Sequence, residues 1–229
     1  MAVVQVVRRF VAIAPGPMAL ALVLGLGLGS VSVAAASERA EQERVPGVGT
    51  ALLALDVALV AFDRKDIDDS FAGVGIGLTA RPTTRLAARL RMERVEEYDA
   101  DELDGVSVHR MRMGLAFRDP VTATIDAVYE FEVGYTSASS EARDFEVFDG
   151  VRSYLEYGVQ VGMSGSSERW RTDLMAVART NNDSDIDNQL GGRLEITGYA
   201  ADFRYAGFIE GEMLTDDRTV RLGVRRMFH

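Results

Sequence analysis

The sequence predicts an all-β fold: an antiparallel up-and-down transmembrane β-barrel of about ten strands, with eight or twelve strands as alternatives. The first observation is period-two alternation of apolar and polar residues from about residue 49 to residue 229, which is typical of strands with one apolar and one polar face. The second is that short turns and longer acidic loops alternate between these segments. The third is an N-terminal segment with the composition of an export signal.

That N-terminal segment, residues 1–36, has the three parts of a secretory signal peptide. Arg8 and Arg9 precede a Leu-, Val-, Ala- and Gly-rich stretch that ends in three alanines at 34–36, and the segment contains no acidic side chain. A basic start, an apolar core and small residues at the end predict cleavage after residue 36. The alternative is a retained transmembrane anchor, because the apolar stretch is rather long.

The rest of the chain divides into a charged lead-in at 37–48, which we expect in the periplasm, and the barrel at 49–229. Without the signal segment the chain keeps 23 basic and 35 acidic residues, a formal charge of −12, so it has no electrostatic reason to bind nucleic acid. The absence of cysteine excludes disulfides and thiolate metal sites. No further apolar run is long enough for a membrane helix, whereas a barrel strand shows its lipid-facing side only in every second residue.

The alternation is clearest at 122–136, where seven apolar residues share one face and mainly Thr, Asp and Glu share the other. The segment 84–95 is rich in helix formers and also suits an amphipathic helix. Its strict alternation of Arg and Glu with Leu, Ala and Met favours a strand. The ten predicted strands are 49–62, 71–81, 84–96, 106–117, 122–136, 150–163, 169–180, 188–198, 202–214 and 218–229.

The connections indicate an even strand number, with both ends of the barrel on one side. Connections after the even-numbered strands are short, for example 81–83 and 118–121, whereas those after the odd-numbered strands are longer and acidic, except the last. In bacterial membrane barrels short turns face the periplasm and longer loops face the outside. The short connections therefore define a turn end, and the acidic ones a loop end.

Strand parity assigns apolar side chains to the lipid and charged side chains to the lumen. Four aromatic residues then fall near the turn end, where an interfacial girdle is expected: Phe117, Trp170, Phe203 and Phe228. Phe62 and Tyr135 are assigned to the girdle at the loop end.

The inward face is predicted to carry rows of arginines and carboxylates. Its predicted members are Arg85, Arg89, Arg91, Arg110, Arg112, Asp126, Glu130, Glu132, Arg152, Glu156, Arg171, Asp173, Arg193, Glu195, Arg204, Glu210, Glu212, Arg221 and Arg225, together with Asp56, Glu93 and Arg179. Guanidinium groups pair bidentately with carboxylates, so the lumen is interpreted either as a salt-bridged plug or as a narrow channel for small solutes. Ten strands are closer to filled barrels of about eight strands than to open ones of about 16.

Together these features make the chain similar to the small bacterial outer-membrane β-barrels of the porin and outer-membrane-protein class. The similarity is one of architecture and covers nearly all of the mature chain, without a family motif. It implies a Gram-negative outer membrane, contact with its lipids and lipopolysaccharide, and recognition of the C-terminal strand by the barrel-assembly machinery. Barrels of this class usually end in an aromatic residue, whereas this chain ends Met227-Phe228-His229, with the aromatic one position early.

Three alternatives stay open. Ser107 and His109 share one strand face and could form a catalytic pair, as in lipid A-modifying barrels, although a histidine at the membrane rim is the simpler interpretation. Acidic stretches at 66–69 and 181–187 offer oxygen ligands for Ca²⁺ or Mg²⁺, but the second lacks the glycine and closing Glu of a calcium loop. A soluble periplasmic β-sandwich or lipid-binding barrel is the structural alternative.

The sequence thus predicts a non-enzymatic outer-membrane barrel without cofactor or metal, acting as a structural barrel or a narrow passive channel for small solutes. The alternative function is a scaffold or adhesin with a closed lumen that displays its acidic loops.

Overall fold

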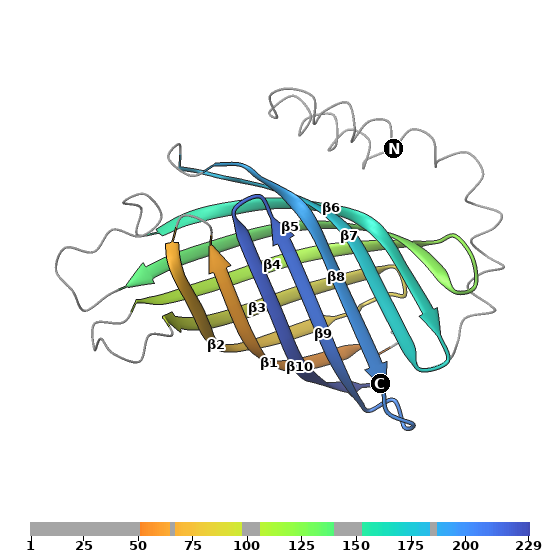
Figure 1. The fold of residues 1–229 in the computed structure, drawn as a ribbon. Helices are drawn as coiled ribbons and strands as arrows, with labels where there is room; N and C mark the ends of the chain where they lie inside the picture. The colour runs from red at the N-terminus through yellow and green to blue at the C-terminus, as the bar shows by residue number, and fades with distance from the viewer. Residues whose placement is uncertain (1–50, 65–66, 98–105, 140–152, 184–186) are drawn as a thin grey trace, which may run out of the picture.

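The computed structural model describes residues 51–64, 67–97, 106–139, 153–183 and 187–229, with side chains for all of these except 67–69 and 139. The predicted signal peptide and lead-in lie outside the described residues. In the described part, ten antiparallel strands close into a barrel (Figure 1). The strands are β1 (Leu53–Arg64), β2 (Ile67–Ala80), β3 (Leu86–Glu97), β4 (Ser107–Pro120), β5 (Ile125–Ser139), β6 (Ser153–Ser167), β7 (Trp170–Asn181), β8 (Gln189–Tyr199), β9 (Tyr205–Leu214) and β10 (Asp217–Phe228).

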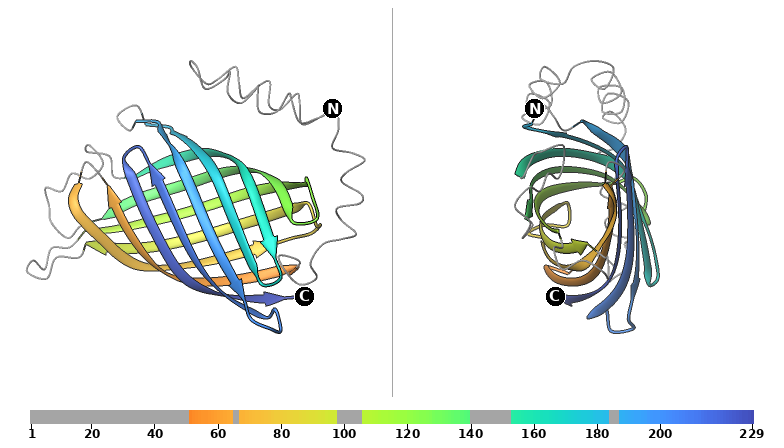
Figure 2. Two further views of the ribbon diagram at one scale, coloured as in Figure 1. Left: turned by 45° about the vertical axis from the view of Figure 1, so that its right-hand side comes forward. Right: turned by 60° about the vertical axis from the view of Figure 1, so that its left-hand side comes forward.

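Each strand pairs with the next one along the chain, and the barrel closes where β1 pairs with β10. This seam runs from Leu53 opposite Phe228 to Arg64 opposite Asp217. The strands are strongly tilted, as two further views show (Figure 2), and such tilt is required to close a sheet into a barrel. Because each of these strands has a partner on both sides, closure removes the sheet edges that would otherwise leave backbone groups unpaired. The predicted fold class is confirmed, with ten strands.

Each predicted strand corresponds to an observed one, with ends that differ by a few residues. The helix considered for 84–95 is wrong, because Leu86–Glu97 is strand β3. β2 begins at Ile67, four residues before the predicted start, so much of the predicted acidic loop belongs to the β1–β2 hairpin. β9 begins only at Tyr205, which leaves 202–204 in a turn.

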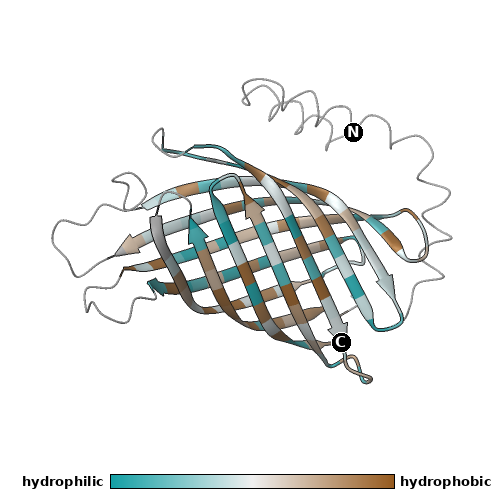
Figure 3. Ribbon diagram, in the orientation of Figure 1, coloured by the Kyte–Doolittle hydropathy of each residue, from teal (hydrophilic) through white to brown (hydrophobic). Residues whose placement is uncertain are grey.

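The outer face of the barrel is apolar. Large hydrophobic side chains on every second strand position are exposed, and the ribbon shows the corresponding alternation of apolar and polar residues along each strand (Figure 3). Examples from six strands are Leu59, Ile76, Met113, Leu174, Leu194 and Leu222. A continuous apolar exterior of this kind has no favourable contact with water and fits a hydrocarbon solvent.

The inner face has apolar clusters at both ends, and between them it carries charged residues together with a third apolar cluster of Val128, Met175, Val177 and Leu214. At the loop end, Val60, Phe62, Phe71, Val95, Val106, Val108 and Tyr154 form a buried cluster, which we name the loop-end cluster. At the turn end, Ala51, Ala54, Tyr199, Ala206 and Met227 form a second cluster, with Phe203 packed against it; this is the turn-end cluster. The charged side chains of the candidate functional site lie between the loop-end cluster and the turn-end cluster. Within the described residues, no helix has the length and apolar character needed to cross a membrane.

Candidate functional site in the barrel interior

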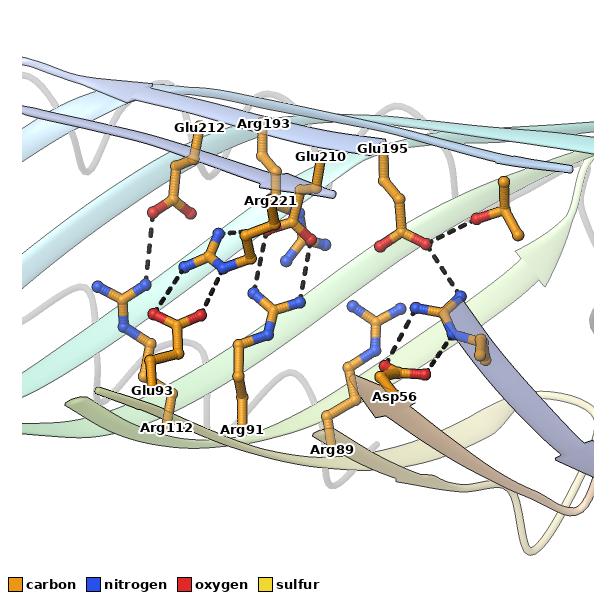
Figure 4. Close-up of polar contacts among 12 residues, drawn as sticks. Asp56, Arg89, Arg91, Glu93, Arg112, Arg193, Glu195, Glu210, Glu212 and Arg221 are labelled. Carbon is orange, nitrogen blue, oxygen red and sulfur yellow. Dashed lines mark hydrogen bonds and ion pairs between the residues drawn. The ribbon is translucent and has the colours of Figure 1, made fainter. Parts of the chain in front are cut away.

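The middle of the lumen is crossed by ion pairs between strands on opposite sides of the barrel (Figure 4). Arg91 on β3 donates two hydrogen bonds of 3.0 Å to the two carboxylate oxygens of Glu210 on β9. Arg193 on β8 reaches Glu130 on β5 at 3.1 Å. These bridges span the lumen, so side chains and not solvent fill its centre.

Arg221 on β10 is the centre of this network. Its side chain, with 1% of its surface exposed, pairs through Nε and Nη2 with Glu93 on β3 and through Nη1 with Glu210 at 2.5 Å. Arg110 on β4 also reaches Glu93, at 2.8 Å. Charge-assisted, multidentate pairs are the strongest hydrogen bonds available to side chains, and here they join four strands through buried groups.

A second group of pairs surrounds Glu212 on β9. Arg179 on β7 donates bidentately to its carboxylate, at 2.8 and 2.7 Å. Arg112 on β4 approaches Glu212 at 3.4 Å and Glu156 on β6 at 3.2 Å. Arg179 also lies 3.2 Å from Glu132. Each guanidinium in this group, that of Arg112 and that of Arg179, therefore contacts more than one carboxylate.

Toward the turn end the pairs are more local. Arg225 donates to Asp56 across the β1–β10 seam at 2.6 and 3.2 Å, and to Glu195 on β8 at 3.0 Å. Arg171 and Asp173, two positions apart on β7, pair at 3.0 Å. The charged layer therefore continues down to the turn-end cluster.

Glycines on the inner face make room for these carboxylates. A Cβ at Gly134 would lie 2.9 Å from Oε2 of Glu156, and one at Gly77 would lie 3.0 Å from Oδ2 of Asp56. Because close cross-strand neighbours compete for the same interior space, a larger residue at either position would displace an ion-paired carboxylate.

One cavity left between these side chains is small. It has a volume of about 30 Å³ and is lined mainly by Arg89, Arg91, Arg112, Glu130, Arg193, Glu195 and Arg225. A second cavity beside Tyr154 and Gln189 measures about 10 Å³. Spaces of this size hold one or two water molecules.

The structure places most of the predicted lumen residues inside the barrel. Buried or half-buried on the inner face are Asp56, Arg89, Arg91, Glu93, Arg110, Arg112, Asp126, Glu130, Glu132, Glu156, Arg171, Asp173, Arg179, Arg193, Glu195, Glu210, Glu212, Arg221 and Arg225. Arg85 and Arg204 are exceptions: both are exposed in turns, because β3 and β9 begin one residue after each of them. Arg152 lies outside the described residues.

Several interior polar residues were missed because the predicted strands were too short. Arg64 lies 3.7 Å from Asp217, and Arg118 lies 3.9 Å from Asp126. These three missed charged residues, Arg64, Arg118 and Asp217, continue the inward parity of their strands by one or two positions. Longer strand assignments would have found them.

The predicted aromatic girdle needs two corrections. Phe117, Trp170 and Phe228 are exposed on the outer face, as is Tyr135 near the loop end. Phe203 instead lies in the turn before β9 with a positive φ of 55°, and its ring packs against Tyr199 in the turn-end cluster. Phe62 points inward into the loop-end cluster, because it shares parity with Asp56, and its ring lies 4.3 Å beneath the guanidinium of Arg110.

The possible catalytic pair lies on the outer face of β4, near the loop end. His109 is exposed and Ser107 half-buried there. Glu96, the register partner of Ser107, is 2.7 Å from Arg94, the register partner of His109. The nearest acid is therefore engaged by an arginine, and loop residues 98–105 lie outside the described chain. Among the described residues no group of three metal-ligating side chains comes together.

Comparison with known proteins gives similarity of fold without a family. No protein-family model matches the chain, and no curated protein matches it. Among solved structures, Neisserial surface protein A is 12% identical with a TM-score of 0.39, covering 77% of this chain and 96% of that one. OprG from Pseudomonas aeruginosa is 11% identical with a TM-score of 0.40, covering 78% and 97%.

The translocator domain of the autotransporter NalP from Neisseria meningitidis is 10% identical with a TM-score of 0.43, covering 91% of this chain and 98% of that one. The barrel architecture is established by the strand pairing of this chain itself.

Proposed function

We propose that this chain is an integral protein of the bacterial outer membrane whose lumen is closed by its own ion pairs, and that it acts as a structural barrel displaying acidic loops outside the cell. The observation that supports this most is the burial of the lumen charges: Glu210 is 0% and Arg221 1% exposed, and each is paired across the lumen with a residue of β3, Glu210 with Arg91 and Arg221 with Glu93.

The membrane location is supported by the distribution of apolar side chains. The strands contain 10–15 residues, which reaches or exceeds the roughly 9–11 needed to cross a bilayer at a steep tilt. Most exposed positions between the girdle aromatics are apolar, with Thr172 and Arg226 as exceptions next to the turn-end girdle, whereas Asp63, Arg94, Glu96 and His109 occupy the outer face near the loop end. This apolar band with polar limits is typical of a barrel in lipid.

The closed lumen distinguishes this function from a channel for small solutes. A continuous aqueous path would have to pass the loop-end cluster, the ion-paired layer and the turn-end cluster in succession. Burying paired charges so completely is favourable only when each is satisfied by its neighbours, and opening a path would separate those pairs. The role we propose is non-enzymatic, with partners that are outer-membrane lipids, lipopolysaccharide and the barrel-assembly machinery acting on β10.

The test is solute permeability of vesicles containing the protein. The protein, expressed from its full sequence, is purified from membranes, reconstituted, and checked for insertion by heat-modifiable migration on a gel. We expect swelling rates in arabinose equal to those of empty vesicles. The variant Glu130→Ala/Arg193→Ala removes a neutral pair that lines the 30 Å³ cavity and should raise the rate if the pairs close the lumen. Swelling of wild-type vesicles well above empty ones would favour the narrow channel instead.

A further inference from the structure

The cavity of about 30 Å³ in the lumen is lined by arginines that do not use all of their hydrogen-bond donors. Arg89 on β3 donates to Glu130 on β5 through Nη1 alone. Its side chain extends into the barrel (Figure 4) and is 17% exposed there. The Nε and Nη2 groups of Arg89 have no acceptor among the described residues, so this side chain brings two unused donors to the cavity.

Two other arginines that line the cavity are in a similar state. Arg91, the next inward residue of β3, donates to Glu210 through Nη1 and Nη2, is 22% exposed, and leaves Nε unused. Arg193 on β8 donates to Glu130 through Nη2 only. Within the part of the chain that the structure describes, its Nη1 and Nε have no acceptor, and Nε is fully buried. Donors from two different strands therefore meet at this cavity.

The carboxylates that line the cavity already have guanidinium partners. These carboxylates are Asp56, Glu130, Glu132 and Glu195. Arg225 donates to Asp56 and to Glu195, and Arg179 lies 3.2 Å from Glu132. Glu130 accepts hydrogen bonds from arginines of both β3 and β8. A cation would find these charges compensated, whereas a ligand that only accepts hydrogen bonds would meet free donors.

The turn-end side of the cavity has a positive electrostatic environment, which Arg81 reports. Arg81 is half-buried just past the end of β2. Burial, and after it the neighbouring guanidinium of Arg171, lower the pKa of Arg81 to about 9. The phenol of Tyr199 acts in the opposite direction, and Arg89 and Arg225, which both line the cavity, lower the pKa further. Negative charge placed in the cavity would relieve this repulsion.

We propose that the cavity binds one small monovalent anion, of which chloride is the simplest, through the unused N–H donors of Arg89, Arg91 and Arg193. The inference rests on the closed lumen proposed above. Hydrogen bonds between a guanidinium and an anion are charge-assisted and strong, and the attraction is greater in a protein interior than in water. A space that holds one or two water molecules accommodates chloride. The anion would then be a fixed part of the plug.

The first test is the dependence of stability on the anion. The protein, expressed from its full sequence, is folded from urea into lipid vesicles in sodium chloride or sodium gluconate of equal ionic strength, so that the anion is present before the lumen closes. Insertion is checked by quenching of Trp170 fluorescence with brominated lipids. The urea midpoint should rise with chloride and not with the bulky gluconate, because a ligand that binds only the folded state stabilises it by mass action.

Two variants show whether the effect comes from this cavity. Arg89→Gln removes unused donors and should weaken the apparent affinity for chloride about tenfold, a change of about 1.4 kcal/mol. Arg118→Gln is the matched control, because Arg118 is also a buried inner arginine, 3.9 Å from Asp126, but does not line the cavity. Its midpoint in gluconate is free to change, whereas its response to chloride should equal that of the wild type.

Bromide locates the anion directly in crystals of protein folded in sodium bromide, because it is a halide with strong anomalous scattering. We expect an anomalous peak in the cavity, beside Arg89 and Arg193. Equal wild-type midpoints in chloride and gluconate would overturn the site. So would the absence of a bromide peak in the cavity, or a loss of chloride response in Arg118→Gln as large as in Arg89→Gln.

Release of radiolabelled chloride separates this inference from the proposed function. Protein folded with the label in detergent micelles, which enclose no bulk solution, is passed by gel filtration into gluconate. A closed lumen predicts that the label stays with the protein. Immediate release from a protein that chloride stabilises, and that shows the bromide peak, would support the anion site and contradict the closed lumen.

Discussion

The inner and outer arginines of β10 show how one strand serves two environments. Arg221 and Arg225 point into the lumen, where each contacts carboxylates from two other strands. Arg218 and Arg226, on the opposite face, are exposed at the two ends of an apolar row. A shift of one residue along the strand thus decides whether an arginine side chain joins the buried ion network or lies on the outer face of the barrel. Charge is tolerated throughout the interior because partners are present, and outside only at the edges of the apolar band.

The largest effect is expected for removal of the central inner arginine. Arg221→Ala leaves Glu93 and Glu210 with fewer positive partners in a buried site, which should lower the free energy of unfolding by about 3–5 kcal/mol. Equilibrium unfolding in urea, followed by Trp170 fluorescence in detergent micelles, measures this. Adding Glu93→Gln should recover part of the loss. A variant as stable as Arg218→Ala would contradict the role of the inner network.

Two of the phenylalanines assigned to the girdles give the next comparison. Phe62 is 3% exposed in the loop-end cluster, whereas Phe117 is 43% exposed on the outer face. Phe62→Ala should cost about 3 kcal/mol through a cavity in packed side chains, and Phe117→Ala should cost clearly less. The same unfolding measurement in lipid vesicles tests this. Equal losses would mean that the two faces are not packed differently.

A charge placed in the middle of the outer face tests the membrane assignment. Val57 is exposed on β1 between Leu55 and Leu59, so Val57→Arg should cost about 2–4 kcal/mol when the barrel is in a bilayer. Val57→Thr is the polar but uncharged control. If Val57→Arg unfolded at the same urea concentration as the wild type in vesicles, the apolar band would not face lipid.

The smallest effect is expected where outer charge already exists. Arg218→Gln removes an exposed arginine whose register partner on β1 is Asp63, and even paired surface charges contribute only about 0–1 kcal/mol. The midpoint of unfolding should therefore change little, and less still at high salt. A loss comparable to that of Arg221→Ala would show that position, and not burial, determines the contribution of these arginines.

Period-two alternation predicted the fold because each strand places apolar side chains on its outer face and mainly charged side chains on its inner face. For the same reason Arg221, Glu210 and Glu130 could be assigned to the lumen from parity alone. The predicted strand ends were less accurate: Arg64, Arg118 and Asp217 lie just past them. Phe203 was misplaced because a turn with positive φ interrupts the parity that was extrapolated through it.

The partners within the lumen could not be predicted. Arg91 and Glu210 are 119 positions apart and belong to strands that are not neighbours. Their contact depends on barrel diameter and strand stagger, which alternation does not specify. The sequence therefore left the plug and the channel as alternatives, and the geometry of the pairs favours the plug.

Single-channel recording in planar bilayers tests the closed lumen most directly. With insertion verified by heat-modifiable migration and by quenching of Trp170, the wild-type protein should produce no discrete ohmic steps. Reproducible steps whose size or ion selectivity changes on charge reversal at Arg89, Arg110 or Glu132 would show that these residues line an open path, and would contradict the account.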